Sequence, residues 1–165
     1  IVYLNEEGLI AGIGDGLFGV NEAVTRAQMA AILYRIFEPE AAALNIKDVK
    51  TTYWSYYEIA AVKNAGLMVG YLDGSFKPNQ TLTRAEMAAI LVRAFDLTAT
   101  NDTVIFSDLG KSGWSWADQP IITLSNLGLA SGVGNGLFKP EKTLTRAELA
   151  VFLANALHYQ ASLID

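Results

Sequence analysis

Residues 70–91 read GYLDGSFKPNQTLTRAEMAAIL, and altered copies of this stretch occur at two other places in the chain. The tetrapeptide Thr-Arg-Ala-Glu/Gln stands at 25–28, 83–86 and 145–148. Each threonine lies thirteen residues after a reference glycine, which is Gly12, Gly70 or Gly132. The spacing is too short for three independent domains, so the sequence predicts three mutually dependent repeats that share one core.

A helix is predicted to begin at each tetrapeptide. The threonine is suited to the N-cap, and Glu or Gln three residues later completes a capping box. Apolar side chains then recur at i, i+3, i+4 and i+7, as on the buried face of a helix. These side chains are Met29, Ile32, Leu33 and Ile36; Met87, Ile90, Leu91 and Ala94; and Leu149, Phe152, Leu153 and Ala156.

A shorter helix is predicted upstream in each repeat. In residues 54–65 the apolar Ile59 and Val62 would face inward, and Gly66 would end the helix. Matching triplets are Ile121, Leu124 and Gly128, and Ile1, Leu4 and Gly8. An Asx-Gly turn follows, and a phenylalanine is expected to anchor it on the core: Phe18, Phe76 or Phe138.

The first repeat is expected to be incomplete at its start. Trp54 lies twelve residues before Gly66, and Trp116 lies twelve residues before Gly128, whereas the matching position falls before residue 1 in the first repeat. We therefore predict repeats at 1–44, 45–103 and 104–165. The expected fold is all-α, with three tandem helix–loop–helix repeats in a pseudo-threefold assembly and grooves between the repeats.

Composition narrows the range of partners. The chain has 165 residues, 52% of them hydrophobic, so it can bury a core. Its 17 acidic and 12 basic residues give a net charge of −5, which argues against nucleic acid or an anionic membrane. Cysteine is absent, which excludes disulfides and thiolate metal sites. Its apolar stretches are too short for membrane insertion, and no signal peptide opens the sequence.

The arginine of the tetrapeptide is unexpected, because a cation at the first helical position costs roughly 0.3–1 kcal/mol. It recurs as Arg26, Arg84 and Arg146, so each guanidinium is predicted to have a partner. Two interpretations remain open. The helix start and the arginine together can bind a carboxylate or phosphate ligand. Alternatively, each arginine pairs with an acidic residue of a neighbouring repeat, for which Asp48 and Asp108 are available.

Trp54 and Trp116 can be read in two ways as well. An exposed indole beside polar groups can stack on a sugar, whereas a buried one would fill the space between repeats. No catalytic residues, metal ligands or cofactor are predicted. A catalytic site is normally single, while every notable feature here is repeated, and the regular oxygen ladder of a calcium loop is missing.

The combined pattern resembles the S-layer homology (SLH) domain. Residues 73–78 (DGSFKP) with 82–86 (LTRAE), and 136–140 (GLFKP) with 144–148 (LTRAE), are close to the family pattern, and the resemblance covers essentially the whole chain. It implies non-covalent anchoring of a secreted surface protein to the bacterial cell wall. The implied ligand is an acidic secondary cell wall polysaccharide linked to peptidoglycan and often bearing a ketal-linked pyruvate.

The resemblance also implies ligand-binding residues. They are the motif arginines Arg84, Arg146 and, with weaker support, Arg26; the Asp and Trp residues Asp48, Trp54, Asp108 and Trp116; and the reference glycines Gly70 and Gly132. On this basis Arg84→Ala or Arg146→Ala is expected to weaken binding and leave the fold intact.

The first repeat departs from the family pattern, because Gly19-Val20 replaces Lys-Pro, Gln28 replaces Glu and the leading loop is absent. At most two functional grooves are therefore expected, around Arg84 and Arg146 or their neighbours, and a neighbouring chain could complete the first repeat by self-association. Two alternatives to glycan anchoring remain open. The chain could be a protein-binding scaffold within an S-layer, or the anchor fragment of a surface glycoside hydrolase.

Overall fold

The structure is a computed structural model that describes residues 1–99, 101, 103–111 and 113–164. It is all-α, as predicted, and no strand occurs among these residues. Residues 100 and 102, between the second and third long helices, and residue 112, in the third repeat, lie outside this description. The helices are α1 (Val2–Glu6), α2 (Arg26–Phe37), α3 (Tyr56–Asn64), α4 (Arg84–Ala94), the 3₁₀ turn η1 (Ser115–Ala117), α5 (Asp118–Asn126) and α6 (Arg146–Ser162).

The three long helices begin where the tetrapeptides predict. Thr25, Thr83 and Thr145 are the N-caps of α2, α4 and α6, and all three capping boxes are formed. Among the upstream helices, α3 begins later than predicted, at Tyr56 and not at Trp54. Their glycine ends are confirmed, because Gly8, Gly66 and Gly128 have φ of 69°, 74° and 71°, the left-handed conformation that suits glycine after a helix.

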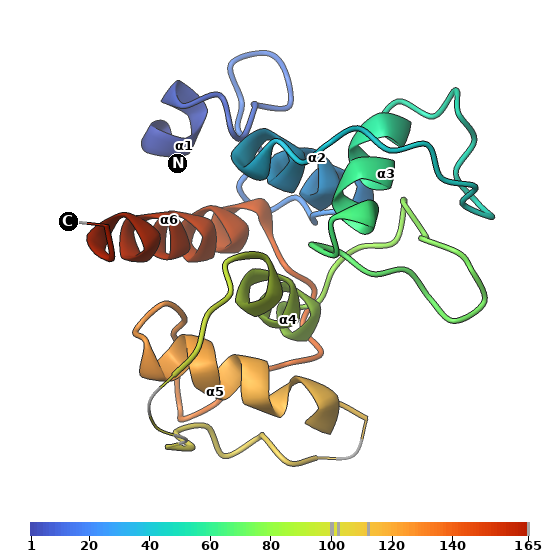
Figure 1. Ribbon diagram of the computed structural model, residues 1–165. Coiled ribbons are helices and arrows are strands. Elements are labelled where there is room, and N and C mark those ends of the chain that lie inside the picture. The colour runs from blue at the N-terminus through green and yellow to red at the C-terminus, as the bar shows by residue number, and fades with distance from the viewer. Residues whose placement is uncertain (100, 102, 112, 165) are drawn as a thin grey trace.

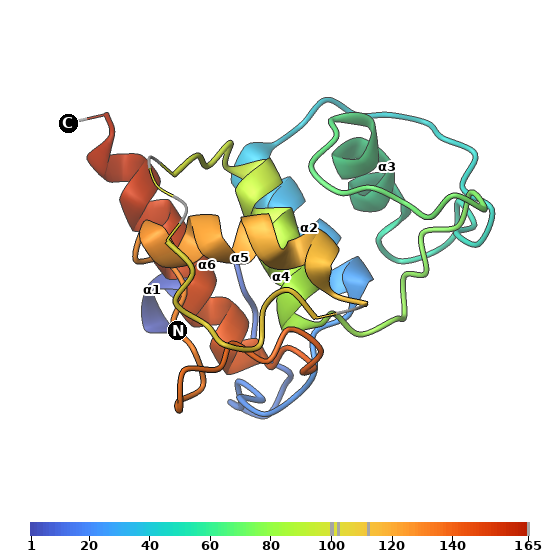
Figure 2. The same ribbon diagram turned by 90° about the horizontal axis from the view of Figure 1, so that it is seen from below.

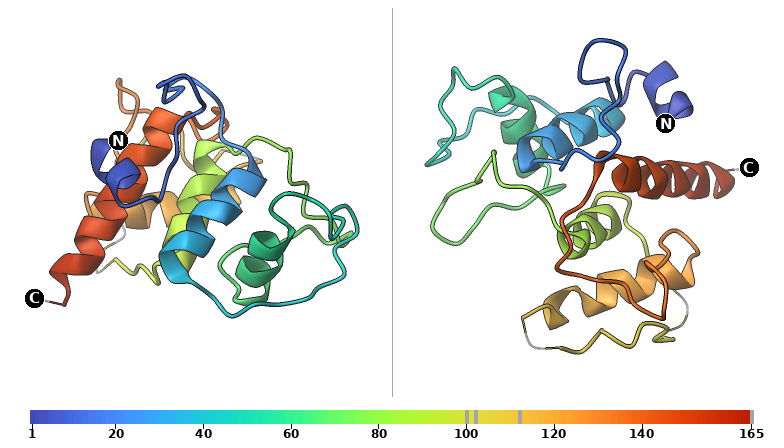
Figure 3. Two further views of the ribbon diagram at one scale, coloured as in Figure 1. Left: turned by 90° about the horizontal axis from the view of Figure 1, so that it is seen from above. Right: turned by 180° about the vertical axis from the view of Figure 1, so that it is seen from behind.

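Each short helix packs against the long helix of the preceding repeat. Figure 1 shows α3 beside α2 and α5 beside α4, and α1 lies against α6. Figure 2, seen from below, and the two views of Figure 3 show the same neighbours. The first repeat therefore closes onto the last.

A closed cycle of backbone hydrogen bonds joins the three loops that precede the long helices. The N–H of Val24 donates to Leu144, that of Leu144 to Leu82, and that of Leu82 to Val24, at 3.1, 2.8 and 2.8 Å. The pseudo-threefold assembly stays a prediction, and this cycle is the contact pattern that it requires. Because each repeat donates to another, the repeats satisfy one another's backbone groups and do not do so alone.

The core follows the predicted apolar positions closely. Ile59, Val62, Ile121, Leu124 and Leu4 have no exposed surface, and the apolar stripes of the long helices are buried apart from the partly buried Ile36. Phe76 and Phe138 are also fully buried, and Phe18 is partly buried. The prediction that Ile1 faces inward is wrong, since Ile1 is exposed at the start of the chain.

Candidate ligand-binding grooves

The motif arginines are buried, with exposed fractions of 6% for Arg26, 2% for Arg84 and 8% for Arg146. Each guanidinium binds two backbone carbonyl groups of another repeat: Nε donates to the turn phenylalanine, and Nη2 to the residue before the reference glycine. The acceptors are Phe76 and Val69 for Arg26, Phe138 and Ser131 for Arg84, and Phe18 and Ala11 for Arg146. The partner expected for each arginine is therefore, in the first place, the backbone of the next repeat.

These contacts make the arginine part of the fold. Each guanidinium also lies over the ring of the turn phenylalanine, with Cζ 4.3 to 4.6 Å from the ring centroid. Removal of the side chain would leave carbonyl groups in the repeat interface without a donor. These contacts argue against the expectation that Arg84→Ala or Arg146→Ala leaves the fold intact, and a loss of stability is predicted instead.

The reference glycines are required by the turn itself. A Cβ on Gly70 would lie 2.7 Å from the carbonyl oxygen of Ser75, and a Cβ on Gly132 would collide with the carbonyl oxygen of Leu137. Both glycines also border the cavities described below. Because these glycines have no side chain, the turn can adopt its tight conformation and the adjoining cavity is not filled.

Asp48 and Asp108 do not pair with the arginines, contrary to the second interpretation above, and they do not line the cavities that contain these arginines. Asp48 accepts hydrogen bonds from the backbone N–H groups of Phe76 and Lys77, at 2.7 and 2.8 Å. Asp108 accepts the equivalent bonds from the turn of its own repeat. Since Lys77 has φ of 54°, the carboxylate stabilises a backbone conformation that lysine rarely adopts.

Three cavities lie between repeats, and each contains one motif arginine beside the reference glycine of the next repeat. We call them the Arg26 groove, the Arg146 groove and the Arg84 groove, with volumes of about 290, 350 and 280 Å³. The Arg26 groove also contains Gly70, Tyr71, Glu86, Arg93 and Trp116. The Arg146 groove contains Gly12, Gln28, Arg35 and Trp54, and the Arg84 groove contains Gly132, Glu148, Val151 and Phe152.

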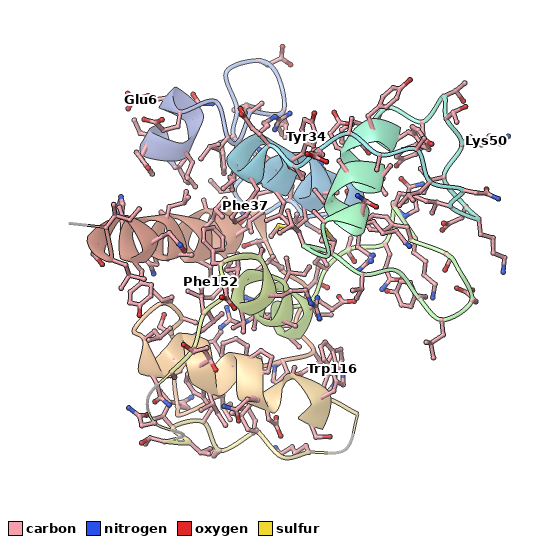
Figure 4. The ribbon with its side chains drawn as sticks, in the orientation of Figure 1. Glu6, Tyr34, Phe37, Lys50, Trp116 and Phe152 are labelled. Atoms are coloured by element: carbon pink, nitrogen blue, oxygen red, sulfur yellow. The ribbon has the colours of Figure 1, made fainter. Side chains whose placement is uncertain are left out.

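The tryptophan in a groove comes from a third repeat. Trp54 and Trp116 are 60% and 54% exposed, so they do not fill the core. Figure 4 shows Trp116 beside the N-terminal end of α5, on the side that faces α4. Among the described residues that line the Arg84 groove there is no tryptophan.

The positions of the tryptophans differ from the expected ranking of the arginines. Arg26 was given the weakest support, yet it shares a groove with Trp116, whereas Arg84 lacks a tryptophan. The reason is that each arginine projects into the groove of the next repeat and not into that of its own. Departures in the first repeat therefore affect the groove of Arg146.

Further groove residues were overlooked because capping alone explained the fourth position of the tetrapeptide. Gln28, Glu86 and Glu148 each line a groove besides closing a capping box. Arg35 and Arg93 stand nine residues after the motif arginine of their own helices. This recurrence in the sequence could have indicated that both are groove residues.

Electrostatic differences separate the three arginines. Burial lowers the pKa of each guanidinium, although arginine remains protonated. The carboxylates that oppose this effect are Glu86 and Asp48 for Arg26, Glu148 and Asp108 for Arg84, and Glu22 for Arg146. Different acidic residues thus act on each of the three guanidinium groups.

The described residues contain no group of three or more His, Asp or Glu side chains that could hold a metal ion. No helix in the described part of the chain is long and apolar enough to cross a membrane.

Comparison with known proteins gives a consistent family match. The model of the S-layer homology domain family matches residues 1–30, 45–88 and 105–150. An S-layer protein of Bacillus licheniformis is 35% identical over 157 residues, and the S-layer protein EA1 of Bacillus anthracis is 36% identical over 160 residues. In both comparisons the match covers 93% of this chain and 18% of the relative.

An amylopullulanase of Thermoanaerobacterium thermosulfurigenes is 33% identical over 165 residues, which covers 95% of this chain and 9% of the relative. The chain thus spans less than a fifth of the length of each of these three relatives. The similarity is confined to one part of each protein.

Proposed function

Because this chain belongs to the S-layer homology domain family, we propose that it anchors a surface protein to the bacterial cell wall by binding an acidic secondary cell wall polysaccharide. Its S-layer relatives indicate a secreted protein of the cell surface. The supporting observation is that two grooves each combine a buried arginine, a reference glycine and an exposed tryptophan. Such a groove offers a cation, backbone groups and a stacking surface to one sugar.

The chemistry of recognition follows from the donors that remain. In Arg26 and Arg146, Nε and Nη2 donate to carbonyl groups, and Nη1 donates to no acceptor among the described residues. A carboxylate of the sugar, such as a pyruvate ketal, would accept from Nη1 in a charge-assisted hydrogen bond. The exposed indole would pack on the apolar face of the same or the adjacent sugar ring.

We propose that the chain itself is not catalytic. The amylopullulanase and an endoglucanase of a Bacillus species share similarity with this chain over 9% and 17% of their lengths. S-layer proteins share it as well. A module common to enzymes and lattice proteins fits a shared attachment role, whatever the attached protein does.

The proposal is tested by calorimetry with purified wall polysaccharide, before and after removal of its acidic ketal groups. We expect binding by the untreated polysaccharide and at least tenfold weaker binding after treatment, as for a buried charge pair that loses one partner. Trp54→Ala combined with Trp116→Ala is expected to abolish binding. Tyr57→Ala is the matched control, because Tyr57 is an exposed aromatic residue outside the three grooves.

Equal binding of treated and untreated polysaccharide would refute recognition of the acidic group. The competing hypothesis of a protein-binding scaffold makes a different prediction. In that case removal of the polysaccharide from wall fragments would leave binding of the chain unchanged.

A further inference from the structure

The three grooves differ in one charged position, and this difference has a consequence for ligand selection. We infer that the fourth residue of the tetrapeptide determines how strongly each groove binds an anion, and that Gln28 makes the Arg146 groove the strongest carboxylate site. The inference rests on the proposed function and adds which groove is used and which residue decides it. It reverses the order that the repeats' similarity to the family pattern suggests.

In the Arg84 groove, the charge of the arginine is already paired with a glutamate of the protein. Nη1 of Arg84 donates to the carboxylate of Glu148 at 3.2 Å, so all three of its nitrogen atoms have a partner. The same oxygen of Glu148 accepts from Lys142 at 2.8 Å. An incoming carboxylate would have to displace Glu148, which the capping box also holds in place.

The Arg26 groove is intermediate. Glu86 lines it, and its charge acts on Arg26, yet the two form no ion pair within 4.0 Å. Nη1 of Arg26 therefore has no acceptor in the described part of the chain. Arg93 lines the same groove and adds a second cation. A ligand carboxylate would be attracted by two arginines and repelled by one glutamate.

The Arg146 groove contains two arginines and no carboxylate among its lining residues. Gln28 occupies the position that glutamate has in the other two grooves, and Arg35 supplies the second cation. The acidic residue that acts on Arg146 is Glu22, which is exposed and does not line the groove. Since Arg146 is more than nine-tenths buried and its Nη1 has no acceptor among the described residues, it retains an unmet capacity to bind an anion.

Helix capping does not explain why glutamine stands at position 28. The Gln28 amide oxygen accepts from the N–H of Thr25 at 2.9 Å, and the N–H of Gln28 donates to the Thr25 hydroxyl at 3.3 Å. Glu86 makes the same two contacts with Thr83, at 2.8 and 3.2 Å. Glutamine and glutamate therefore both close the capping box, and the glutamates also accept a hydrogen bond from the threonine hydroxyl, at 3.2 Å for Glu86 and 3.1 Å for Glu148. The difference that concerns a ligand is the charge that faces the groove.

The tryptophans allow the Arg146 and Arg26 grooves to be measured separately by NMR. The indole N–H of Trp54 reports on the Arg146 groove, and that of Trp116 on the Arg26 groove. The probes are methyl N-acetylhexosaminides of gluco, galacto and manno configuration, each carrying a 4,6-linked pyruvate ketal. Their methyl esters are the uncharged controls. The proteins are the unchanged chain, Gln28→Glu and Glu86→Gln.

We expect Trp54 to respond at a lower probe concentration than Trp116 in the unchanged chain. Gln28→Glu should raise the Trp54 midpoint by roughly five- to twentyfold, and Glu86→Gln should lower the Trp116 midpoint by a similar factor, as for a close charge pair. The methyl esters should show neither effect. Gln28→Glu is expected to fold normally because glutamate occupies the same position in the other two capping boxes.

An unchanged Trp54 midpoint in Gln28→Glu would overturn this inference while leaving the proposed function in place. If the small probes do not bind, the same variants are compared by calorimetry with wall polysaccharide, and equal affinities would again overturn it. Failure of the unchanged chain to bind the polysaccharide at all would instead refute the proposed function, and the inference with it.

Discussion

Replacement of Arg84 by alanine should destabilise the fold and not only weaken binding. The side chain is 2% exposed and donates to Phe138 at 2.8 Å, to Ser131 at 2.9 Å and to Glu148 at 3.2 Å. A buried acceptor that loses its donor costs about 1–3 kcal/mol, and breaking a buried ion pair from one side costs about 3–5 kcal/mol. We expect a loss of roughly 3–5 kcal/mol in the free energy of unfolding.

Urea unfolding and calorimetry measure this loss. For a chain of this size, 1 kcal/mol corresponds to about 2–4 °C in Tm, so the variant should melt roughly 10 °C lower. Arg93→Ala is the matched control, because Arg93 is an exposed arginine on the same helix, and its replacement should change stability by less than about 0.5 kcal/mol. A loss below about 1 kcal/mol for Arg84→Ala would refute the reasoning that the guanidinium holds the second and third repeats together.

Three further predictions concern the turn, the groove surface and acid stability. Gly132→Ala should lose about 1–3 kcal/mol in the free energy of unfolding measured with urea, because the new Cβ would lie 2.7 Å from Phe106. Ser131→Ala is the control, and equal stability of the two variants would contradict the packing argument. Trp116→Ala should leave Tm within about 2 °C of the unchanged chain, because the indole is exposed, while polysaccharide binding to the Arg26 groove is lost; a large fall in Tm would show that it supports the core. Burial raises the pKa of Asp108, but the hydrogen bonds from Phe138 and Lys139 outweigh this effect, so the pKa is lowered. The contribution of Asp108 to the free energy of unfolding should therefore be complete above the unfolded-state pKa of about 3.9 and disappear as pH falls through the folded-state pKa. Asp108→Asn should therefore be less stable than the unchanged chain at pH 7 and lose less stability on acidification; parallel curves of unfolding free energy against pH would argue against it.

Local features of the fold could be predicted because they depend on neighbours in sequence. The capping boxes, the glycine ends and the apolar stripes need only residues within a few positions of one another. The late start of α3 could not be predicted with the same certainty. Ser55 and Glu58 do have the Ser-x-x-Glu spacing of a capping box, but Ser55, the N-cap, makes no side-chain capping bond, so this signal is weaker than at the three long helices.

The candidate site was predicted by residue type more accurately than by arrangement. The motif arginines, the tryptophans and the reference glycines do line the grooves, whereas Asp48 and Asp108 bind the turn backbone. These roles cannot be separated from the sequence, because an aspartate has the same spacing to the motif whether it binds backbone N–H groups or a ligand.

The sequence by itself determined that the chain is a threefold helical repeat and that the arginine in each capping box needs a partner. Only the tertiary structure decided which partner. Each short helix packs on the long helix of the preceding repeat, so every groove takes its arginine from one repeat and its glycine from the next, and two of them take their tryptophan from a third. Such assignments depend on contacts between residues 43 to 135 positions apart, which local physical chemistry does not specify.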